Sequence, residues 1–509
     1  AEAPKKGGDF IAIYQPGSLP AHFNCGIQSG AAMAFPGAQI FASLVEIDDK
    51  WKPVPYLAKS WEISEDGETY TFHLVEDAVF HDGQPVTSED VAFSLEIVKE
   101  NHPFGAYMFE VVDRVKTPDK HTVVIELDDP SPALMMALSP ALMPILPKHV
   151  YGDGQPIRTH PANAKPIGCG PFKLAKFEPG EYFILERNPN YFRKGLPYLD
   201  RIIGRVVDDI NAAIITMKQG KGHSLGYLAD PHKIKILKKS KNLKLGSAGY
   251  EGIAATYFLE FNLRRDTFKD IRVRQAIAYA MDLDFITKKL HMGFTRKATG
   301  PIHSKTLFYT DQVKTYPLDL EKANQLLDEA GFPRKDDGMR FSATLEWFPG
   351  SDMKNVAEYL KPQLKKVGID IQLKAPAGFL PWMMRIGNWK HDLTLNNYFM
   401  WGDPMIGVHR IFHSGNIRKQ VWTNTSGYKN RKVDKLLEAA AEEMDFEKRK
   451  ALYAEFQKII SEDLPLYFTY EAPYHTAYHK DLRNVPIPSI WGAATPNDKI
   501  YWKNGRTPK

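Results

Sequence analysis

Cysteine is scarce in this chain, which has only two thiols, Cys25 and Cys169, among 509 residues. Two cysteines are too few for a disulfide scaffold or for a metal site built from four thiolates. In an oxidising compartment they could form one disulfide with each other if their Cα atoms lay within about 7 Å. Two separately buried thiols that behave as small apolar side chains are an equally good interpretation, so the sequence leaves both alternatives open.

Long hydrophobic runs are missing as well. The sequence contains no stretch of about 18 consecutive apolar residues, the length that a membrane-spanning helix requires, so no such helix is predicted. The chain opens with Ala-Glu-Ala-Pro instead of an initiator Met. We interpret this as a mature end left by removal of a signal peptide, which favours an extracytoplasmic location.

Neither sign of charge dominates the composition. The 66 Lys and Arg residues face 61 Asp and Glu residues, which leaves a net charge of +5. We find no basic block, no array of zinc ligands and no recognition helix flanked by basic residues. The positive excess is therefore interpreted as scattered over a solvated surface, and no nucleic-acid partner is predicted.

Candidate motifs for catalysis and metal binding are weak. Gly-His-Ser-Leu-Gly at residues 222–226 fits the short Gly-x-Ser-x-Gly pattern, which by itself does not establish a nucleophile elbow, and the glycine-rich stretch at residues 220–224 has the wrong spacing for a phosphate loop. His409 and His413 are four residues apart, a spacing that suits a metal on one helical face, but no third ligand is evident. We favour two ordinary histidines at these positions. The sequence thus predicts no catalytic residue, no cofactor and no metal site.

Strand and helix patterns alternate along the chain. An apolar stretch at residues 10–14 and an alternating one at 70–74 predict strands, and Asp66-Gly67 predicts a turn before the second. Helices are predicted at residues 39–44, 91–99, 273–281, 320–330 and 448–462, with Thr87 as the cap of the second. The length and this alternation indicate an α/β protein of two or three domains with more than one sheet.

Several short motifs occur in a fixed order along the chain. Residues 55–61 are Pro-Tyr-Leu-Ala-Lys-Ser-Trp, residues 80–91 are Phe-His-Asp-Gly-Gln-Pro-Val-Thr-Ser-Glu-Asp-Val, and residues 168–172 are Gly-Cys-Gly-Pro-Phe. Arg-Asn-Pro-Asn-Tyr follows at 187–191, Phe-Asn at 261–262, Asp-Ile-Arg-Val-Arg-Gln-Ala at 270–276, and Gly-Tyr-Lys-Asn at 427–430. With this ordered set, nearly the whole chain resembles the extracellular solute-binding proteins of family 5, which serve dipeptide and oligopeptide ABC importers.

The resemblance implies a bilobal, periplasmic-binding-protein-like α/β fold of type II, in its large variant. Lobe I would hold residues 1–40, 165–258 and 475–509, an extra domain at 41–164 would pack on it, and lobe II would hold 259–474. The chain would cross between the lobes near 258–262 and 470–474. The implied function is that of a monomeric periplasmic protein, not an enzyme, which captures a small polar solute by hinge closure and delivers it to the transmembrane subunits of an ABC permease.

The resemblance also implies ligand contacts from a loop near residues 20–30, from residues 245–251 and from residues 380–405. The predicted contact residues are Asn24, Tyr107, Tyr250, Trp382, Arg385, Asn397, Tyr398, Trp401, Asp403 and Trp491.

The charged members of this set each have an alternative interpretation. Asp403 matches an aspartate that pairs with the ligand's amino group in peptide-binding relatives, with an ordinary Asp-Pro turn as the equal alternative. Dipeptide-binding relatives place an arginine near residues 346–350, and this sequence has none there. Arg385 is a candidate substitute, with a simple surface charge as the alternative. The aromatic residues suit stacking on a ligand or packing in the core.

The missing arginine weakens the prediction of a standard dipeptide. The leading prediction is a peptide or peptide-like solute, and the alternatives are an oligosaccharide, an opine-like compound or a metal chelate. A secreted hydrolase is the alternative from another functional class.

Overall fold

The chain folds into two compact units in the computed structural model, which describes residues 3–14 and 19–508. The first unit takes the described residues of Ala1–Leu228, His232–Glu251 and Tyr474–Lys509, and the second takes Ala229–Pro231 and Gly252–Pro473. The main crossings therefore lie at residues 251–252 and 473–474. The crossing predicted at 258–262 is wrong, because β13 (Thr256–Phe261) is an internal strand of the second unit's sheet.

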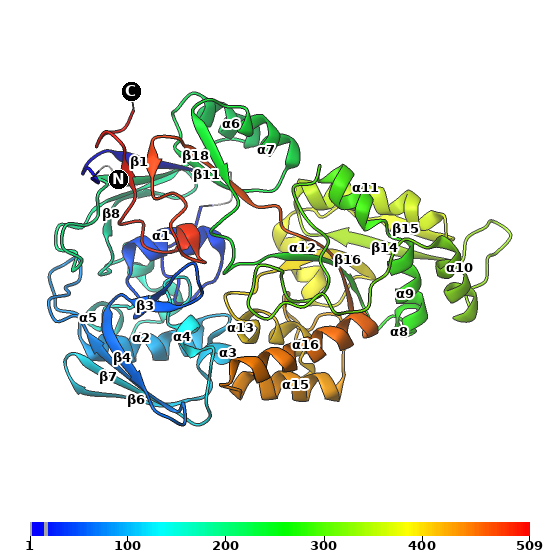
Figure 1. The fold of residues 1–509 in the computed structure, drawn as a ribbon, viewed down its shortest axis with the longest axis horizontal. Coiled ribbons are helices and arrows are strands. Elements are labelled where there is room, and N and C mark those ends of the chain that lie inside the picture. Colours follow the sequence, from blue (N-terminus) through cyan, green and yellow to red (C-terminus); the bar gives the residue numbers. More distant parts are fainter. Residues whose placement is uncertain (1–2, 15–18, 509) are drawn as a thin grey trace. The chain divides into compact units, whose positions relative to one another are not determined.

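The first unit is organised around a seven-stranded mixed sheet (Figure 1). Its central strand β1 (Asp9–Tyr14) pairs in parallel with β10 and β11, while β9, β8, β18 and β12 add antiparallel pairs. In spatial order the strands are β12 (Leu243–Gly246), β18 (His475–His479), β11 (Ser224–Leu228), β1, β10 (Arg201–Val206), β9 (Tyr182–Arg187) and β8 (Phe172–Glu178).

A second, antiparallel sheet in the same unit accounts for much of residues 41–164. Its order is β4 (Ala58–Ile63), β5 (Thr69–Leu74), β7 (Thr122–Leu127) and β6 (Val112–Asp119). Strand β5 alternates between buried and half-buried residues, as its sequence predicts. Helix α2 (Ser88–Asn101) begins after Thr87, whose backbone N–H donates to Asp90 Oδ2 at 2.8 Å. A separate domain at 41–164 stays a prediction, since the chain divides into two compact units only.

The second unit contains a five-stranded sheet. Its order is β15 (Ile369–Leu373), β14 (Phe341–Trp347), β16 (Leu393–Tyr398), β13 and β17 (Leu466–Glu471). Every residue of β13, β16 and β17 is buried. Strands that are covered on both faces lose the alternation of a half-exposed strand, so even the polar residues of these three strands are buried. The longer helices of this unit are α9 (Ile271–Ala280), α10 (Leu320–Glu329), α11 (Ser351–Lys365), α12 (Phe379–Gly387), α15 (Arg431–Glu442) and α16 (Phe446–Asp463).

Short elements complete the two units. The first unit also contains β2 (Val45–Ile47), β3 (Pro53–Pro55), β19 (Leu482–Arg483), β20 (Tyr501–Trp502) and the helices α1 (Ala31–Ile40), α3 (Gly105–Phe109), α4 (Leu134–Ala137), α5 (Lys148–Tyr151), α6 (Ile210–Lys218) and most of α7 (Pro231–Lys238). The second unit contains α8 (Asp266–Lys269), the π-helix η3 (Phe285–Leu290), α13 (Pro404–Gly407) and α14 (His409–Phe412). Within the described residues, no helix combines the length and the apolar character needed to cross a membrane.

The two cysteines do not form a disulfide. Cys25 and Cys169 are both buried free thiols. Cys25 packs in the aromatic core beside Phe23, with its Sγ close to Gly37, whereas Cys169 lies in the motif at residues 168–172. Burial raises the pKa of each thiol to about 12, so both behave as small apolar side chains. Of the two alternatives that the sequence left open, the structure supports the unpaired thiols.

A buried histidine at the end of α2 predicts a pH dependence of stability. His102 accepts a hydrogen bond from the Phe104 backbone N–H at Nδ1, and its Nε2 has no partner among the described residues. Burial lowers the pKa of His102 from 6.5 to about 3. A depressed folded-state pKa contributes stability above the unfolded-state pKa, and this stability is lost as the pH falls toward the folded-state value.

We expect the stability difference between the wild type and His102→Gln to shrink by about 2 kcal/mol between pH 7 and pH 5, because only the wild type loses this contribution. Denaturant unfolding of both proteins at the two pH values measures the effect. A difference that does not change with pH would show that His102 is not held neutral in the fold.

Candidate functional site

The predicted ligand-contact residues fall in both units, and each unit is described by itself. Asn24, Tyr107, Tyr250 and Trp491 belong to the first unit, and Trp382, Arg385, Asn397, Tyr398, Trp401 and Asp403 belong to the second. The structure shows which of these side chains are already occupied by partners within their own unit.

Asp403 is held by an arginine of the same unit. It caps α13 by accepting the Met405 backbone N–H at Oδ1 (2.9 Å). Arg449 of α16 donates from Nη1 to Oδ2 at 2.7 Å and from Nη2 to Oδ1 at 2.8 Å, and both side chains are less than one tenth exposed. Burial alone would lower the pKa of Arg449, but attraction to Asp403 outweighs it and the pKa is raised. Asp403 is therefore the Asp-Pro turn of the alternative interpretation, and its assignment as an anchor for a ligand's amino group is corrected.

The two histidines near this ion pair do not converge on a common point. His409 is buried and its Nε2 lies 2.9 Å from the Tyr453 hydroxyl, while burial lowers its pKa to about 3. His413 lies with Nε2 at 3.1 Å from Glu438 Oε1. Each imidazole thus has a partner of its own. Among the described residues, no group of three or more His, Cys, Asp or Glu side chains is placed to hold a metal ion.

Arg385 reaches the segment in which the sequence lacks an arginine, but it is not free there. Its Nε donates to Glu346 Oε2 at 2.9 Å and its Nη2 donates to Glu346 Oε1 at 2.7 Å. The Glu346 side chain is only 2 % exposed, so the guanidinium compensates a buried carboxylate. The hydrogen bond with Glu346 is the main reason why the pKa of Arg385 is raised. The pair is neutral overall, which corrects the assignment of Arg385 as a free positive charge for a ligand carboxylate.

Two of the three predicted aromatic contacts of the second unit are core residues. Trp382 is 1 % exposed and packs against Phe348 and Trp422, at centroid distances of 5.3 and 6.3 Å. Tyr398 is equally buried and donates its hydroxyl to the Pro301 carbonyl. The assignment of these two rings as stacking platforms is corrected in favour of core packing. Trp401 is buried in a left-handed backbone conformation, and its contact with a ligand stays a prediction.

Asn397 differs from these residues. It lies near the end of β16, and its backbone carbonyl accepts the indole N–H of Trp422 at 2.8 Å. Within residues 3–14 and 19–508, its side-chain amide makes no hydrogen bond, although the residue is only 6 % exposed. A mostly buried amide normally has hydrogen-bond partners, so this group is suited to a polar ligand atom. The side chain of Asn397 thus retains unused hydrogen-bonding capacity, as does the buried indole N–H of Trp382 within the described residues.

In the first unit, Tyr250 belongs to a cluster of three tyrosines. Its hydroxyl accepts the Tyr227 backbone N–H at 2.9 Å and lies 2.6 Å from Thr476 Oγ1. Its ring centroid lies 5.2 Å from that of Tyr227 and 5.5 Å from that of Tyr474, and burial raises its pKa. Sequence reasoning missed Tyr227 and Tyr474. The signal that could have identified Tyr474 is its position next to the chain crossing, but Tyr227 has no comparable signal.

The other predicted contacts of the first unit have different surroundings. Asn24 is fully buried, donates to Asn163 Oδ1 at 2.9 Å and accepts the Gly26 backbone N–H at 2.9 Å. It holds its own loop, which corrects its assignment as a ligand contact. Trp491 is 1 % exposed, and its role as a ligand contact stays a prediction. Tyr107 of α3 is half-buried, and its contact with a ligand stays a prediction.

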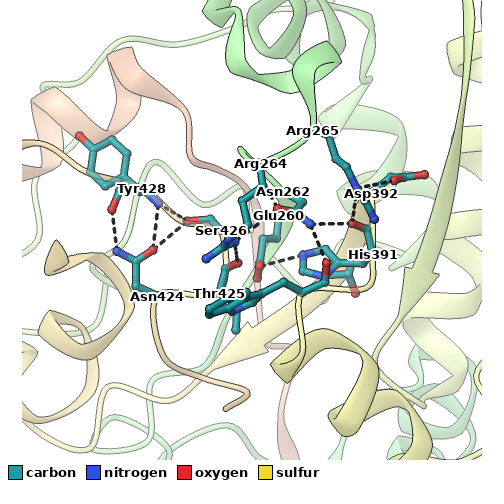
Figure 2. A network of polar contacts seen from close by, with 12 residues as sticks. Glu260, Asn262, Arg264, Arg265, His391, Asp392, Asn424, Thr425, Ser426 and Tyr428 are labelled. Atoms are coloured by element: carbon teal, nitrogen blue, oxygen red, sulfur yellow. Dashed lines mark hydrogen bonds and ion pairs between the residues drawn. The ribbon is translucent and has the colours of Figure 1, made fainter. Parts of the chain in front are cut away.

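Figure 2 shows a polar network at the end of β13, in the second unit. Asn262 donates from Nδ2 to the Trp389 and His391 carbonyls at 3.0 and 2.8 Å, and Arg264 donates to the Thr425 carbonyl at 2.8 Å. His391 lies 3.1 Å from Glu260, and both are buried. Arg264 also covers the ring of Trp389 at 4.0 Å. These hydrogen bonds connect two loops to the end of β13. The Phe-Asn motif at residues 261–262 therefore has a structural role in this network.

Comparison with known proteins gives a consistent result over most of the chain. The family model described as bacterial extracellular solute-binding proteins, family 5 Middle, matches residues 52–419. The oligopeptide-binding protein AppA of Bacillus subtilis is 28% identical over 502 residues, which cover 95% of this chain and 89% of that protein. The structure of AppA in complex with a nonapeptide has a TM-score of 0.84 at 26% identity, and the match covers 98% of this chain and 100% of that one.

Two further solved structures are similar in fold but contain other ligands. NikZ from Campylobacter jejuni, in complex with Ni(L-His), has a TM-score of 0.83 at 27% identity and covers 96% of this chain and 97% of its own. AgaA from A. tumefaciens R10, in complex with agropinic acid, has a TM-score of 0.78 at 25% identity and covers 97% of this chain and 99% of its own. One architecture of this kind thus accommodates peptides, a metal complex and an opine-type acid.

Proposed function

This chain belongs to the family 5 bacterial extracellular solute-binding proteins, and on that premise we propose that it captures a small polar, peptide-like solute between its two units and delivers it to an ABC permease. The observation that carries the proposal is the match of residues 52–419 to the family model, in a chain whose two compact units are joined by two main crossings. Ligand contacts from both units would stabilise a closed state over an open one. We propose a monomer that acts in the periplasm and releases its ligand chemically unchanged.

Asp403 and Arg385, the two charged residues among the predicted ligand contacts, are both paired with charges of the protein itself, and this limits the class of solute that we propose. Asp403 is neutralised by Arg449, and Arg385 is neutralised by Glu346. A zwitterionic dipeptide bound by a free aspartate and a free arginine at these positions is therefore not the solute that we propose. Recognition would depend on uncharged groups, namely the Asn397 amide and the cluster of Tyr227, Tyr250 and Tyr474. A longer peptide, bound through its backbone, fits such groups.

An opine-like solute is the second candidate. It is favoured by the agropinic acid bound to AgaA, which is 25% identical to this chain. Thermal unfolding with mixtures of peptides and with agropinic acid separates the two candidates. A ligand at about 100 times its Kd should stabilise the folded protein by about 2.7 kcal/mol, and only the true class of solute produces such a shift.

We expect Asn397→Ala to weaken solute binding roughly 3-fold to 10-fold, because one uncharged hydrogen bond contributes about 0.5–1.5 kcal/mol. Isothermal titration with the solute identified in the thermal screen measures the change. The matched control is Asn504→Ala, which removes an exposed amide of the first unit and should leave the affinity unaltered. Equal affinities of the wild type and Asn397→Ala would remove this residue from the proposed site.

A further inference from the structure

A local excess of positive charge lies in residues 210–246, most of which belong to the first unit. Residues 210–246, from the start of α6 to the end of β12, contain eight Lys and one acidic residue, Asp230. Eight minus one gives +7, which exceeds the net charge of +5 for the whole chain. The positive excess is thus uneven along the chain. The lysines are Lys218, Lys221, Lys233, Lys235, Lys238, Lys239, Lys241 and Lys244.

These lysines, which we call the lysine patch, come from elements that are linked to one another. The Lys233 ammonium of α7 donates to Asn211 Oδ1 of α6 at 2.6 Å, and Figure 1 shows the two helices together at the edge of the first unit. The other seven lysines are exposed, and in the described part of the chain none of them forms an ion pair with a carboxylate. Two carboxylates near this segment in the sequence accept hydrogen bonds from backbone N–H groups: Asp209 caps α6, and Glu251 accepts the Gly249 backbone N–H.

Two exposed isoleucines accompany the lysine patch. Ile215 of α6 is 55% exposed and lies three residues before Lys218, while Ile236 of α7 is 42% exposed and lies three residues after Lys233. Residues three apart are neighbours on a helix surface. Each helix thus presents an apolar side chain next to an ammonium group, a combination typical of surfaces that contact the interface of a membrane.

We propose that the lysine patch binds the surface of a membrane containing anionic phospholipids, and that it holds the protein there peripherally. Protein–protein interfaces favour Arg and are depleted in Lys, since bidentate recognition of a carboxylate requires the guanidinium fork. The patch contains eight Lys and no Arg. Attraction to a layer of lipid phosphates requires many positive charges close together, but no fixed hydrogen-bond geometry. Clustered lysines meet this requirement at membrane surfaces.

Vesicle co-sedimentation tests the proposal with the complete protein. We expect binding to vesicles of phosphatidylcholine mixed with phosphatidylglycerol, and none to phosphatidylcholine alone. The triple variant Lys238→Gln, Lys239→Gln, Lys241→Gln should bind roughly 100-fold more weakly, because each lysine near an anionic surface contributes roughly fivefold. Raising the salt to about 1 M should also release the protein, since the Debye length falls to about 3 Å.

The matched control carries the same change of net charge elsewhere. Lys335, Lys361 and Lys450 of the second unit are exposed and form no ion pair within the described residues. Their replacement by Gln should leave vesicle binding unchanged. Equal loss in both triple variants would show that net charge, and not the patch, is responsible. Absence of binding to anionic vesicles, or binding to duplex DNA that exceeds binding to the vesicles, would overturn the proposal.

Discussion

Asp403→Ala should destabilise the second unit by about 3–5 kcal/mol, because it leaves the Arg449 guanidinium buried without its carboxylate. Both Arg449 Nη atoms donate to Asp403 at 2.7 and 2.8 Å, and the two side chains are only 4% and 8% exposed. The substitution also removes the cap of α13. Denaturant unfolding, followed by a probe in the second unit, measures the loss.

The same variant separates a structural aspartate from a ligand anchor. If Asp403 is structural, the folded fraction of Asp403→Ala should bind solute with the affinity of the wild type. The control is Asp266→Ala, which breaks an exposed ion pair with Lys269 and should leave the stability nearly unchanged. Unchanged stability with abolished binding would restore the interpretation of Asp403 as the anchor of a ligand's amino group.

Gly168→Ala should destabilise the first unit by about 3 kcal/mol, at the upper end of the usual cost of overpacking. A Cβ at this position would lie 2.0 Å from the Ile40 carbonyl oxygen and 2.7 Å from the Ile40 carbonyl carbon. Because the clashing atoms belong to the Ile40 backbone, no change of side-chain rotamer can relieve the clash. The Gly170 backbone N–H donates to the same Ile40 carbonyl at 2.8 Å, which fixes the close approach of the two segments.

Gly300→Ala is the matched control for this prediction. A Cβ at Gly300 would meet no atom within 4 Å, and its backbone lies outside the left-handed region. Its stability should stay within about 0.5 kcal/mol of the wild type. Thermal unfolding of both variants gives the comparison, and similar midpoints for the two would contradict the packing around the Gly-Cys-Gly-Pro-Phe motif.

Local patterns predicted many of the elements correctly. The strand expected at residues 70–74 is β5, and the helix expected at 448–462 is α16, which spans Phe446–Asp463. Both have a strong local signal, because one alternates in burial and the other is long and well capped. The helix expected at 39–44 is wrong, since α1 covers Ala31–Ile40 and ends there. Its sequence has no polar face and contains Pro36, so the helical period is not visible.

The partners of the candidate residues could not be predicted in the same way. Asp403 and Arg449 are 46 positions apart, and Glu346 and Arg385 are 39 apart. Which charged side chains form ion pairs depends on how the strands and helices pack, and this packing cannot be inferred from the spacing of the residues in the sequence. The motif Asp-Pro indicated a turn, but only the structure shows that Arg449 occupies the carboxylate. Conversely, Asn397 was predicted among many candidates, and only the structure shows that its largely buried amide makes no side-chain hydrogen bond within the described residues.

The lysine patch shows a different limit of sequence reasoning. The lysines are visible in the sequence, but the overall balance of 66 basic and 61 acidic residues conceals how unevenly they are distributed. The joining of α6 and α7 by the bond between Lys233 and Asn211 brings the two charged helices together.

Native mass spectrometry tests the central claim most directly, with protein purified without denaturation and then incubated with a mixture of peptides. A carrier should display a discrete added mass, and denaturation should release a compound with the same mass as one that was supplied or co-purified. Fragments of the supplied peptides, growing in amount with incubation time, would mean that the chain cuts what it binds and is not a solute carrier.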